Sequence, residues 1–518
     1  MKQTINFCIQ FTQRLLMKNL FESSIWQTKA NNNRMKSIKI YIPILLVFMA
    51  ALQWSCSDDF LTEEPTTALP SDDVFKSIIT ADAALVGAYD ALSTYSFEGL
   101  YWPIMSDLMG DDVMVVPGAG NWGWFVEAYQ LELLPNYSWV DSPWWAAYKI
   151  IYDANQFVAY GNTVPDATEE QKNELVGQGK ALRALVMLKL AQLYAPAYHT
   201  NPDALSIINV TEPVDANSED YPRALNREVY AQIESDLLSA VSLLDNNGEG
   251  SRADNRYDEG FLDKRGANAL LARLYQDMHE WEKARDHAKA AYEGLELMSL
   301  DYWVNYGFSY RTSETIFTVA YTLSDNNTYL SIPSFYYPIA GYSSIRLNDE
   351  FVNLYRAGDA RKEYVIYQDD EIDTERHFTT KFIHNNQVGN AERISIRATE
   401  MYLIEAECEA ELGNYGNAQD ALWAVQERVF SRSSKSSATG QALIDEILLE
   451  RRKELFGEGF RLNDIKRRSL PILRKGDHWA DADFVFGDDN YYRLTFPIPQ
   501  SEIDANPLIN EEHQNEGY

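Results

Sequence analysis

Apolar residues recur at intervals of three and four positions in several separated blocks of the chain, as at Leu270, Leu274 and Met278. This spacing gathers them on one face of a helix. The pattern predicts helices over 79–92, 144–160, 169–194, 227–244, 264–278, 280–297, 394–412, 415–430 and 442–456. The segment 314–321, "ETIFTVAY", is rich in β-branched and aromatic residues and predicts a strand. We therefore expect a mainly α fold with minor β-strands.

Long stretches rich in glycine, proline, asparagine and aromatic residues separate these blocks. They cover 99–143, 196–225, 301–392 and 471–499. Connections of this length usually carry function or small strands of their own. The helical part of the fold is thus interrupted by long irregular loops.

Two of the helical blocks resemble each other. "ALLARLYQDMHEWEKARDHA" begins at Ala269 and "LIEAECEAELGNYGNAQDAL" begins at Leu403. Alanines recur at matching positions, and an aromatic residue, Trp281 or Tyr415, follows the turn in each block. This arrangement is typical of tetratricopeptide-like helix pairs. Since such pairs cannot bury their apolar faces alone, we expect them to stack into a scaffold.

The first 55 residues have the layout of an export signal. Residues 40–52, "IYIPILLVFMAAL", carry no charge, and Lys36 and Lys39 stand just before them. A helix of that length spans about 20 Å, against about 30 Å of bilayer hydrocarbon, so it is short for a membrane anchor. Met35 fits as the start of translation, because an ordinary signal layout begins there. The alternative is an unusually long leader.

Cys56 ends the apolar run, and it admits two interpretations. It is either a small apolar residue at the end of the signal or the acylated cysteine of a lipoprotein. "LQWSC" resembles a bacterial lipobox, with Ser55 in the small position, although Gln53 stands where leucine is usual. The acids that follow, "SDDFL", resemble the surface-export signal of Bacteroidota lipoproteins. Both flanks favour a lipid anchor on Cys56.

Charge and cysteine content restrict the function classes. The formal net charge is −32, and residues 1–55 contribute +6 to it, so the remainder carries −38. Such a chain repels nucleic acid and anionic lipid surfaces. Cys8, Cys56 and Cys408 are the three cysteines. Removal of the signal and lipidation of Cys56 would leave Cys408 alone, which excludes a disulfide framework. Cys408 lies on an apolar helical stripe and is expected in the core.

Several stretches together resemble the SusD/RagB family over nearly all of the chain that follows Cys56. "SDDFLTEEPT" resembles the opening of the family, and "GKALRALVMLKLAQLYA" at 179–195 resembles its long helix. The most specific pieces are "LLERRKELFGEGFRLNDIKRR" from Leu448 and "FPIPQSEIDANPLINEEHQNEGY" from Phe496. Within the latter, Glu516 stands where proline is common.

The resemblance implies a fold, a location and a partner. It implies one body over 56–518, mostly helical, with ligand loops at about 99–143 and 301–392 on one face of the scaffold. It further implies an outer-membrane lipoprotein on the cell surface that caps a SusC-like TonB-dependent transporter. Such a protein captures a nutrient, usually an oligo- or polysaccharide, and is not an enzyme. A binder of peptides or glycopeptides in the same family and a glycan hydrolase are the alternatives.

Two aromatic loops are candidates for the ligand site. A tryptophan face stacks on the apolar face of a pyranose, and an amide bonds hydroxyl groups. The alternative is that the rings only pin the loops to the scaffold, but the family places ligand aromatics near the first loop. The candidates are Asn121, Trp122, Trp124, Tyr329, Tyr336 and Tyr337. By contrast, Trp144, Trp145 and Tyr148 stand at the head of a helix, where their spacing favours the core.

Signals for catalysis and cofactors are weak. "GAGNWG" at 118–123 fits a dinucleotide-binding turn, but no alternation of strands and helices surrounds it. Glu450 and Glu454 lie four apart on one helix, as paired carboxylates, yet Arg451, Arg452 and Arg461 are near in sequence. We expect a structural ion-pair network there and no catalytic residue.

No metal is expected, although calcium has two candidate positions. Asp111 with Asp112, and "SDNN" at 324–327, offer oxygen ligands, but acidic loops are common in so acidic a chain. The seven histidines show no ligand spacing. His279 and His287 flank the turn of a helix pair and are expected to be solvated helix residues.

Overall fold

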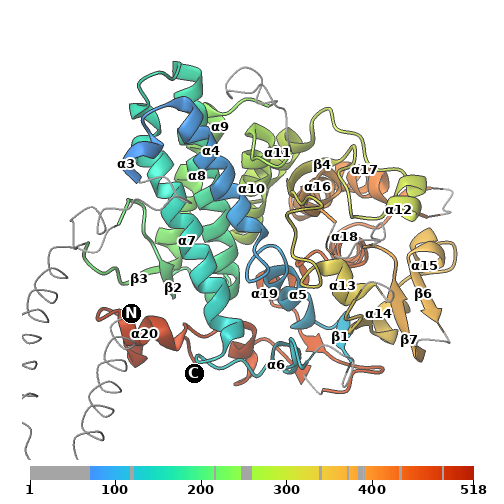
Figure 1. The fold of residues 1–518 in the computed structure, drawn as a ribbon. Helices are drawn as coiled ribbons and strands as arrows, with labels where there is room; N and C mark the ends of the chain where they lie inside the picture. The colour runs from blue at the N-terminus through green and yellow to red at the C-terminus, as the bar shows by residue number, and fades with distance from the viewer. Residues whose placement is uncertain are drawn as a thin grey trace, which may run out of the picture. The chain divides into compact units, whose positions relative to one another are not determined.

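The structure, a computed structural model, describes residues 71–116, 122–214, 218–246, 259–337, 341–369, 373–382, 389, 391–430, 434–480 and 483–518. Figure 1 shows how the elements of this part are arranged. The predicted signal region 1–55 and Cys56 lie outside the described residues.

A run of helices, each packed against the next, forms the scaffold. α7 packs on α8, α8 on α9, α9 on α10, α10 on α11, α11 on α16, and α16 on both α17 and α18. Their bounds are α7 Ser138–Tyr160, α8 Glu169–Tyr194, α9 Asn226–Leu243, α10 Lys264–Asp277, α11 Trp281–Tyr292, α16 Ala398–Glu411, α17 Tyr415–Gln426 and α18 Gln441–Glu454. The predicted pairs α10–α11 and α16–α17 therefore join into one stack, although residues 293–397 separate them in sequence.

The central helix of this stack is α8, which is buried on nearly every side. A capping box between Thr168 and Gln171 fixes its start. From Glu174 onward most of its side chains are buried, because α7 and α9 cover it on both sides. The one arginine of this helix, Arg183, is balanced by Asp236 of α9 at 2.8 Å. A charged side chain buried in a large core needs such a partner.

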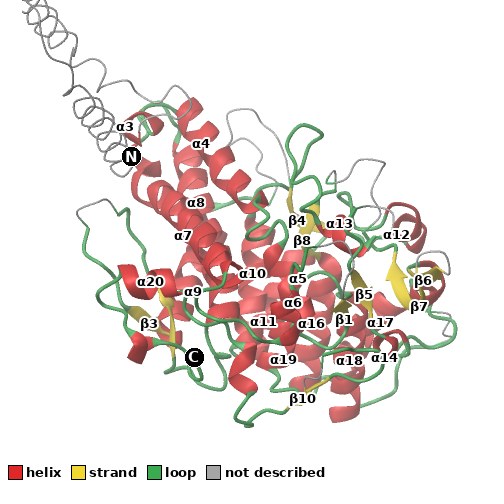
Figure 2. Ribbon diagram, turned by 60° about the horizontal axis from the view of Figure 1, so that its bottom comes forward, coloured by secondary structure: helices red, strands yellow, loops and turns green. Residues whose placement is uncertain are grey.

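The long loops carry most of the remaining elements (Figure 2). The remaining helices are α3 Ser71–Val74, α4 Ile78–Asp90, α5 Tyr101–Leu108, α6 Val126–Gln130, α12 Leu300–Tyr306, α13 Ile332–Tyr336, α14 Asp349–Val352, α15 Ala360–Tyr364, α19 Arg461–Arg467 and α20 Gln500–Ala505. The strands are β1 Val113–Val115, β2 Leu205–Ile208, β3 Arg223–Leu225, β4 Thr315–Val319, β5 Ile345–Leu347, β6 Ile366–Asp369, β7 Asp373–Thr379, β8 Arg393–Arg397, β9 Ile472–Leu473 and β10 Asp483–Phe484.

All strand pairs of the described part are antiparallel. One sheet has the order β1-β5-β7-β6, and β4–β8, β2–β3 and β9–β10 form separate ribbons. β4 confirms the strand predicted at 314–321. β1 precedes the glycine-rich segment and lies antiparallel to β5, which argues against a dinucleotide-binding turn, since that turn needs a parallel unit.

One helix prediction is wrong at its start. Residues 394–397 belong to strand β8 rather than to the following helix, and α16 begins only at Ala398. All five residues of β8 are buried against β4. Ile394 and Ile396 fit the alternation of a strand as well as the start of the next helical stripe, so the local pattern was ambiguous.

No helix of the described residues is long and apolar enough to cross a membrane. Cys408 is a fully buried free thiol in α16, as expected from its apolar stripe.

Candidate functional site

The two candidate loops meet because a strand pair ties their ends together. β1 ends at Val115, just before the tryptophan loop, and Val115 pairs with Ile345, which opens β5. The ladder continues for one more bond, from the Val116 N–H to the Ser344 carbonyl at 2.8 Å. The tyrosine loop ends where β5 begins. Strand pairing between segments far apart in sequence thus brings the two loops to one edge of the sheet.

Aromatic rings from both loops form one connected cluster. Trp124 lies 5.3 Å from Trp139, 6.1 Å from Phe335 and 6.4 Å from Tyr95, between ring centroids. Phe335 in turn lies 5.1 Å from Tyr342, and Tyr342 lies 6.1 Å from Tyr329. These separations are those of favourable edge and tilted ring pairs.

The outward side of this cluster is called here the aromatic platform. It consists of Tyr95, Trp124, Tyr329 and Tyr342, together with the exposed Trp122, which belongs to it by its place in the same loop, two residues before Trp124. Trp122 is 89% exposed, Tyr329 is 54% exposed and Tyr95 is 39% exposed, while Trp124 and Tyr342 are half-buried. A monomeric protein rarely leaves so many large rings exposed together unless they contact something.

The tryptophan loop holds Trp122 outward through a left-handed turn. Trp122 has φ of 58°, Gly123 has φ of 82° and Phe125 has φ of 65°. Phe125 is fully buried and anchors the turn against Trp139 at 5.1 Å between ring centroids. Non-glycine residues in this backbone region cost roughly 1–3 kcal/mol each. The backbone of this turn is therefore strained, and in this conformation the Trp122 ring lies in solvent.

The six sequence candidates do not all reach this surface. Trp122, Trp124 and Tyr329 lie on the aromatic platform, and Tyr337 is half-buried at the end of α13. Asn121 lies outside the described residues. Tyr336 is only 1% exposed, so its ring belongs to the core and cannot stack on a ligand. Tyr336 ends α13 and Tyr337 follows it, so the two side chains point in different directions, whereas the sequence pattern does not distinguish the two tyrosines.

Sequence reasoning missed Tyr95 and Tyr342. Tyr95 lies just after α4 in a segment whose ring content, "TYSFEGLY", was a usable signal. Tyr342 lies within the predicted loop at 301–392, five residues after Tyr337, and contacts the rings of Phe335 and Tyr329. Both belong to the platform because of tertiary contacts, which no local pattern predicts.

The three aromatic residues assigned to the core at the head of α7 behave differently from one another. Trp144 is 2% exposed, and its indole N–H donates to Glu502 at 3.1 Å. The Tyr148 hydroxyl donates to the Ile208 carbonyl at 2.9 Å. Trp145, however, is 68% exposed, so its assignment to the core is wrong. Neighbouring helix positions do not share a face, and only Trp144 of the pair can turn inward.

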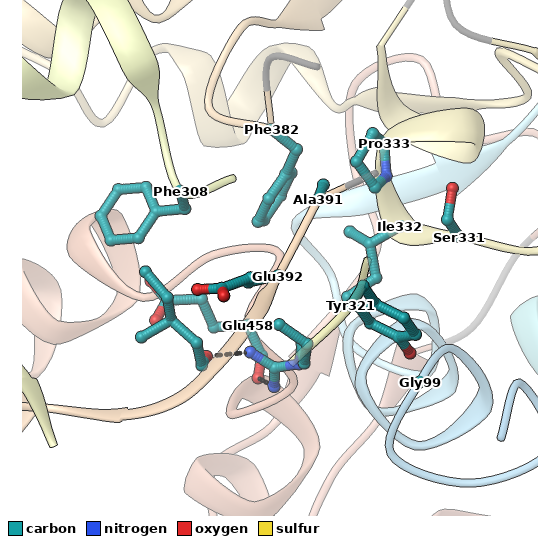
Figure 3. A pocket seen from close by; sticks show the side chains of 12 residues that line it. Gly99, Phe308, Tyr321, Ser331, Ile332, Pro333, Phe382, Ala391, Glu392 and Glu458 are labelled. Atoms are coloured by element: carbon teal, nitrogen blue, oxygen red, sulfur yellow. Dashed lines mark hydrogen bonds between the residues drawn. The ribbon is translucent and has the colours of Figure 1, made fainter. Parts of the chain in front are cut away.

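A cavity beside this region is too small for a sugar ring (Figure 3). It is about 20 Å³ in volume and is lined by Tyr321, Ile332, Phe382 and Glu392, among others. Such a space admits about one water molecule. A sugar ring therefore cannot occupy this cavity, and the exposed rings beside it are the candidate binding surface.

Glu450 and Glu454 confirm the predicted structural network. Both are buried in α18, and Arg361 lies 2.6 Å from Glu450 and 2.8 Å from Glu454. Arg397 lies 3.1 Å from Glu454, and Arg428 lies 2.5 Å from it. Arg428, Arg397 and Arg361 hold the pKa of Glu454 down to about 2 against the opposing effect of burial. Carboxylates so enclosed cannot reach a glycosidic bond.

The partners expected for this network were partly wrong. Arg451 pairs with Asp464 at 2.9 Å, and Arg461 pairs with Asp111 at 2.7 Å, so neither bridges the two glutamates. Gly457 and Gly459 follow α18 with φ of 78° and 86° and turn the chain back. A carbon at the Gly459 Cβ position would lie 2.7 Å from the Pro103 backbone, so only glycine fits this turn.

The two candidate calcium positions carry other interactions. Arg452 and Arg461 neutralise Asp111 and Asp112. In "SDNN", the Asn326 and Asn327 amides donate to backbone carbonyls at 2.8 Å and 2.6 Å. In the part of the chain that the structure covers, no group of three or more His, Cys, Asp or Glu side chains is placed to hold a metal.

His279 and His287 are not solvated, contrary to expectation. His279 stacks between His199 and Trp281, at 4.1 Å and 4.6 Å between ring centroids. His287 donates from Nδ1 to the Asn268 side-chain oxygen at 2.8 Å and stacks on Tyr275. Burial lowers the pKa of both imidazoles. They are packing residues of the helix pair, because the turn between α10 and α11 is covered by the segment around residue 199.

Comparison with known proteins gives consistent matches along the chain. Residues 352–518 match the model of the SusD family, and residues 59–276 match a model described as starch-binding associating with outer membrane. The SusD-like protein P25 of Formosa agariphila is 23% identical, over 93% of this chain and 100% of that protein.

Solved structures share the fold. A SusD superfamily protein of Bacteroides thetaiotaomicron has a TM-score of 0.74 and 25% identity, over 85% of this chain and 99% of that one. A SusD-like carbohydrate binding protein of Bacteroides vulgatus has a TM-score of 0.73 and 24% identity, over 84% and 98%.

Proposed function

Because the chain belongs to the SusD/RagB family, we propose that it captures a glycan on the aromatic platform and is not an enzyme. The observation that carries the proposal is that rings of two distant loops, from Trp124 to Tyr329, are held together, with Tyr329 and the neighbouring Trp122 of the first loop exposed. The descriptions of the second family model, as starch-binding, and of the Bacteroides vulgatus protein, as carbohydrate binding, support it.

The platform suits the chemistry of a sugar chain. Each pyranose has an apolar face that stacks on an aromatic ring and a hydroxyl rim that accepts and donates hydrogen bonds. A stacked ring contributes about 0.5–1.5 kcal/mol beyond its buried area. A few rings and amide contacts on an open surface give weak binding, with a Kd of about 10 μM to 1 mM.

Weak capture is sufficient if the ligand passes directly to a neighbouring channel. We infer that Cys56 carries a lipid anchor, that the acids after it direct the protein to the cell surface, and that the body 56–518 is one unit. We further infer that it caps a SusC-like TonB-dependent transporter in the outer membrane. Tethering to the transporter keeps a released ligand at high effective concentration.

The two alternative functions that the sequence analysis considered have less support. A peptide or glycopeptide would also contact exposed rings, and it remains the alternative ligand of the same surface. A glycan hydrolase would need an accessible pair of carboxylates. Glu450 and Glu454, the pair that the sequence suggested, are enclosed by arginines.

A glycan array, followed by calorimetry with each ligand found, tests the proposed function. We expect at least one oligo- or polysaccharide to bind, without turnover, and Trp122→Ala to weaken it. Binding confined to peptides, or hydrolysis of any glycan by the purified protein, would contradict the proposal.

The proposed lipid anchor and surface location can be tested separately from ligand binding. Cys56→Ala should move the protein from the membrane to the soluble fraction, while replacement of both Asp58 and Asp59 by alanine should leave it membrane-bound but facing the periplasm. Protease shaving of intact cells distinguishes the two cases. If the double variant is shaved as readily as the unchanged protein, these acids do not direct export.

A further inference from the structure

The charged residues around the aromatic platform bear on whether its ligand is neutral or anionic. The described segments that form the platform and its border are 93–101, 122–125, 321–337 and 341–345. Their polar side chains are hydroxyls and amides, from serine, threonine, tyrosine and asparagine. Glu98 and Asp325 are the charged residues of these four segments, and both are acidic.

Glu98 does not contribute charge to the surface. It is fully buried, and Lys189 lies 2.8 Å from it. The Ser395 hydroxyl also donates to it, at 2.6 Å. The pKa of Glu98 is lowered, because Lys189 and Arg393 outweigh its burial. The ion pair is internal, so a ligand on the platform meets neither partner directly.

Asp325 places negative charge at the border of the platform. It stands two residues before Asn327, whose amide donates 2.6 Å to the Ser93 carbonyl, beside the segment that carries Tyr95. Asp90 lies close to Asp325, and the proximity of this second carboxylate together with burial raises the pKa of Asp90. Asp90 and Asp325 together line a cavity of about 220 Å³ that also includes Leu92, three residues before Tyr95, in a chain whose net charge is −32.

Cations near the region are paired with acidic or carbonyl groups, although Arg311 keeps 31% of its side chain exposed and Lys149, which lies near Asp90 and pairs with Asp153 at 3.3 Å, keeps 64% exposed. Arg393, which lines the small cavity, is 4% exposed and donates to the Glu458 carbonyl at 2.6 Å. Arg311 lies 3.1 Å from Glu392 and 3.2 Å from Glu259. Binding of a carboxylated or sulfated sugar typically uses an arginine fork or a lysine aimed at the anion.

We propose that the platform selects uncharged glycans and discriminates against glycans that carry uronate or sulfate groups. This inference rests on the proposed function, since it specifies the ligand class of the same site. Tyrosine, serine, threonine and asparagine groups match the hydroxyl rim of a neutral sugar. An anionic sugar placed there would meet Asp325 and Asp90 with like charge, and the field of the whole chain adds to the repulsion.

Matched pairs of glycans test the proposal. A panel of neutral glucans, mannans and galactans is compared with the same polymers oxidised at C6, which converts the CH₂OH group into a carboxylate and leaves ring and linkage unchanged. Affinity electrophoresis ranks the panel, and calorimetry measures the pairs that bind. We expect each oxidised polymer to bind at least about tenfold more weakly than its neutral parent at low ionic strength. The gap should narrow as salt screens the repulsion.

A charge variant separates this repulsion from a steric effect of oxidation. Asp325→Asn should reduce the discrimination about two- to threefold without weakening the neutral parent. Asp504→Asn, on α20, is the matched control and should leave the discrimination unchanged. Equal or tighter binding of the oxidised polymers, abolished by Trp122→Ala, would overturn the inference and leave the proposed function standing. Binding of neither class would overturn the proposed function itself.

Discussion

Replacement of Trp122 by alanine should remove affinity while it leaves the fold intact. The ring is 89% exposed, so roughly a tenth of its surface is buried. A tryptophan side chain offers about 250 Å². At about 25 cal/mol per Å², the lost burial is worth less than about 1 kcal/mol of unfolding free energy. The left-handed backbone at this position stays equally strained with alanine, since both residues carry a Cβ.

The effect on binding should be larger. If a sugar covers about 100 Å² of the ring, truncation loses about 2.5 kcal/mol, and measured central contacts span about 1–3 kcal/mol. The Kd should therefore rise about tenfold to a hundredfold. Calorimetry with a ligand found on the array measures this change, and thermal melts of the same samples measure stability.

Two other tryptophans serve as controls. Trp145→Ala removes an equally large exposed ring on α7, outside the platform, and should change neither binding nor stability. Trp144→Ala removes a buried ring and should lower the unfolding free energy by about 3–5 kcal/mol while binding persists at a permissive temperature. If Trp122→Ala binds normally but melts early, Trp122 is a packing residue and the proposed site is wrong.

Three further changes test other parts of the structure. Tyr336→Phe removes a buried hydroxyl that has no hydrogen-bond partner among the described residues, so thermal melts should show stability unchanged or raised by about 1 kcal/mol, with glycan binding retained. Lost binding would return Tyr336 to the site. Glu454→Gln should cost about 3–5 kcal/mol at pH 7 in denaturant titrations, because it leaves buried arginines unpaired. The native pKa of Glu454, about 2, lies below its ordinary value of 4.5, so its contribution is present above pH 4.5 and is lost as pH falls toward 2; a gap between the two proteins that does not shrink over this range would refute the assignment. Gly99→Ala places a Cβ 2.1 Å from the Ser93 carbonyl, which should shift the Tyr95 segment, cost about 1–3 kcal/mol in melts and weaken glycan binding, whereas Gly416→Ala has open space around it and should do neither.

Helices with a strong apolar stripe were predictable from sequence because their pattern is local. α8 begins and ends at the predicted residues, and α10 ends one residue before the predicted end. The pairing of α10 with α11 and of α16 with α17 also followed from the sequence, since two similar blocks with small residues at matching positions imply the same packed unit. The resemblance to the SusD/RagB family rests on continuous stretches of the same kind.

The partners of the buried charged residues could not be predicted from the local sequence. The sequence indicated that Glu450 and Glu454 were structural, because cations were plentiful around them. It chose neighbours in the chain as partners, whereas Arg361 and Arg397 come from other elements. Which arginine neutralises which glutamate depends on the packing of β8 and α15 against α18, and no spacing along one helix contains that information.

The sequence by itself determined the helical scaffold, the two aromatic loops and the strand at 315–319, since each follows from the periodicity or composition of one segment. Only the tertiary structure decided that the two loops share a surface, through the pairing of Val115 with Ile345, and that Trp122 and Trp145 face solvent while Trp144 and Tyr336 do not. The physical reason is that the exposure of a side chain and the pairing of a strand depend on which other segments of the chain pack against them. The residue pattern of one segment indicates whether that segment is a helix or a strand, but it does not indicate which segments become its neighbours.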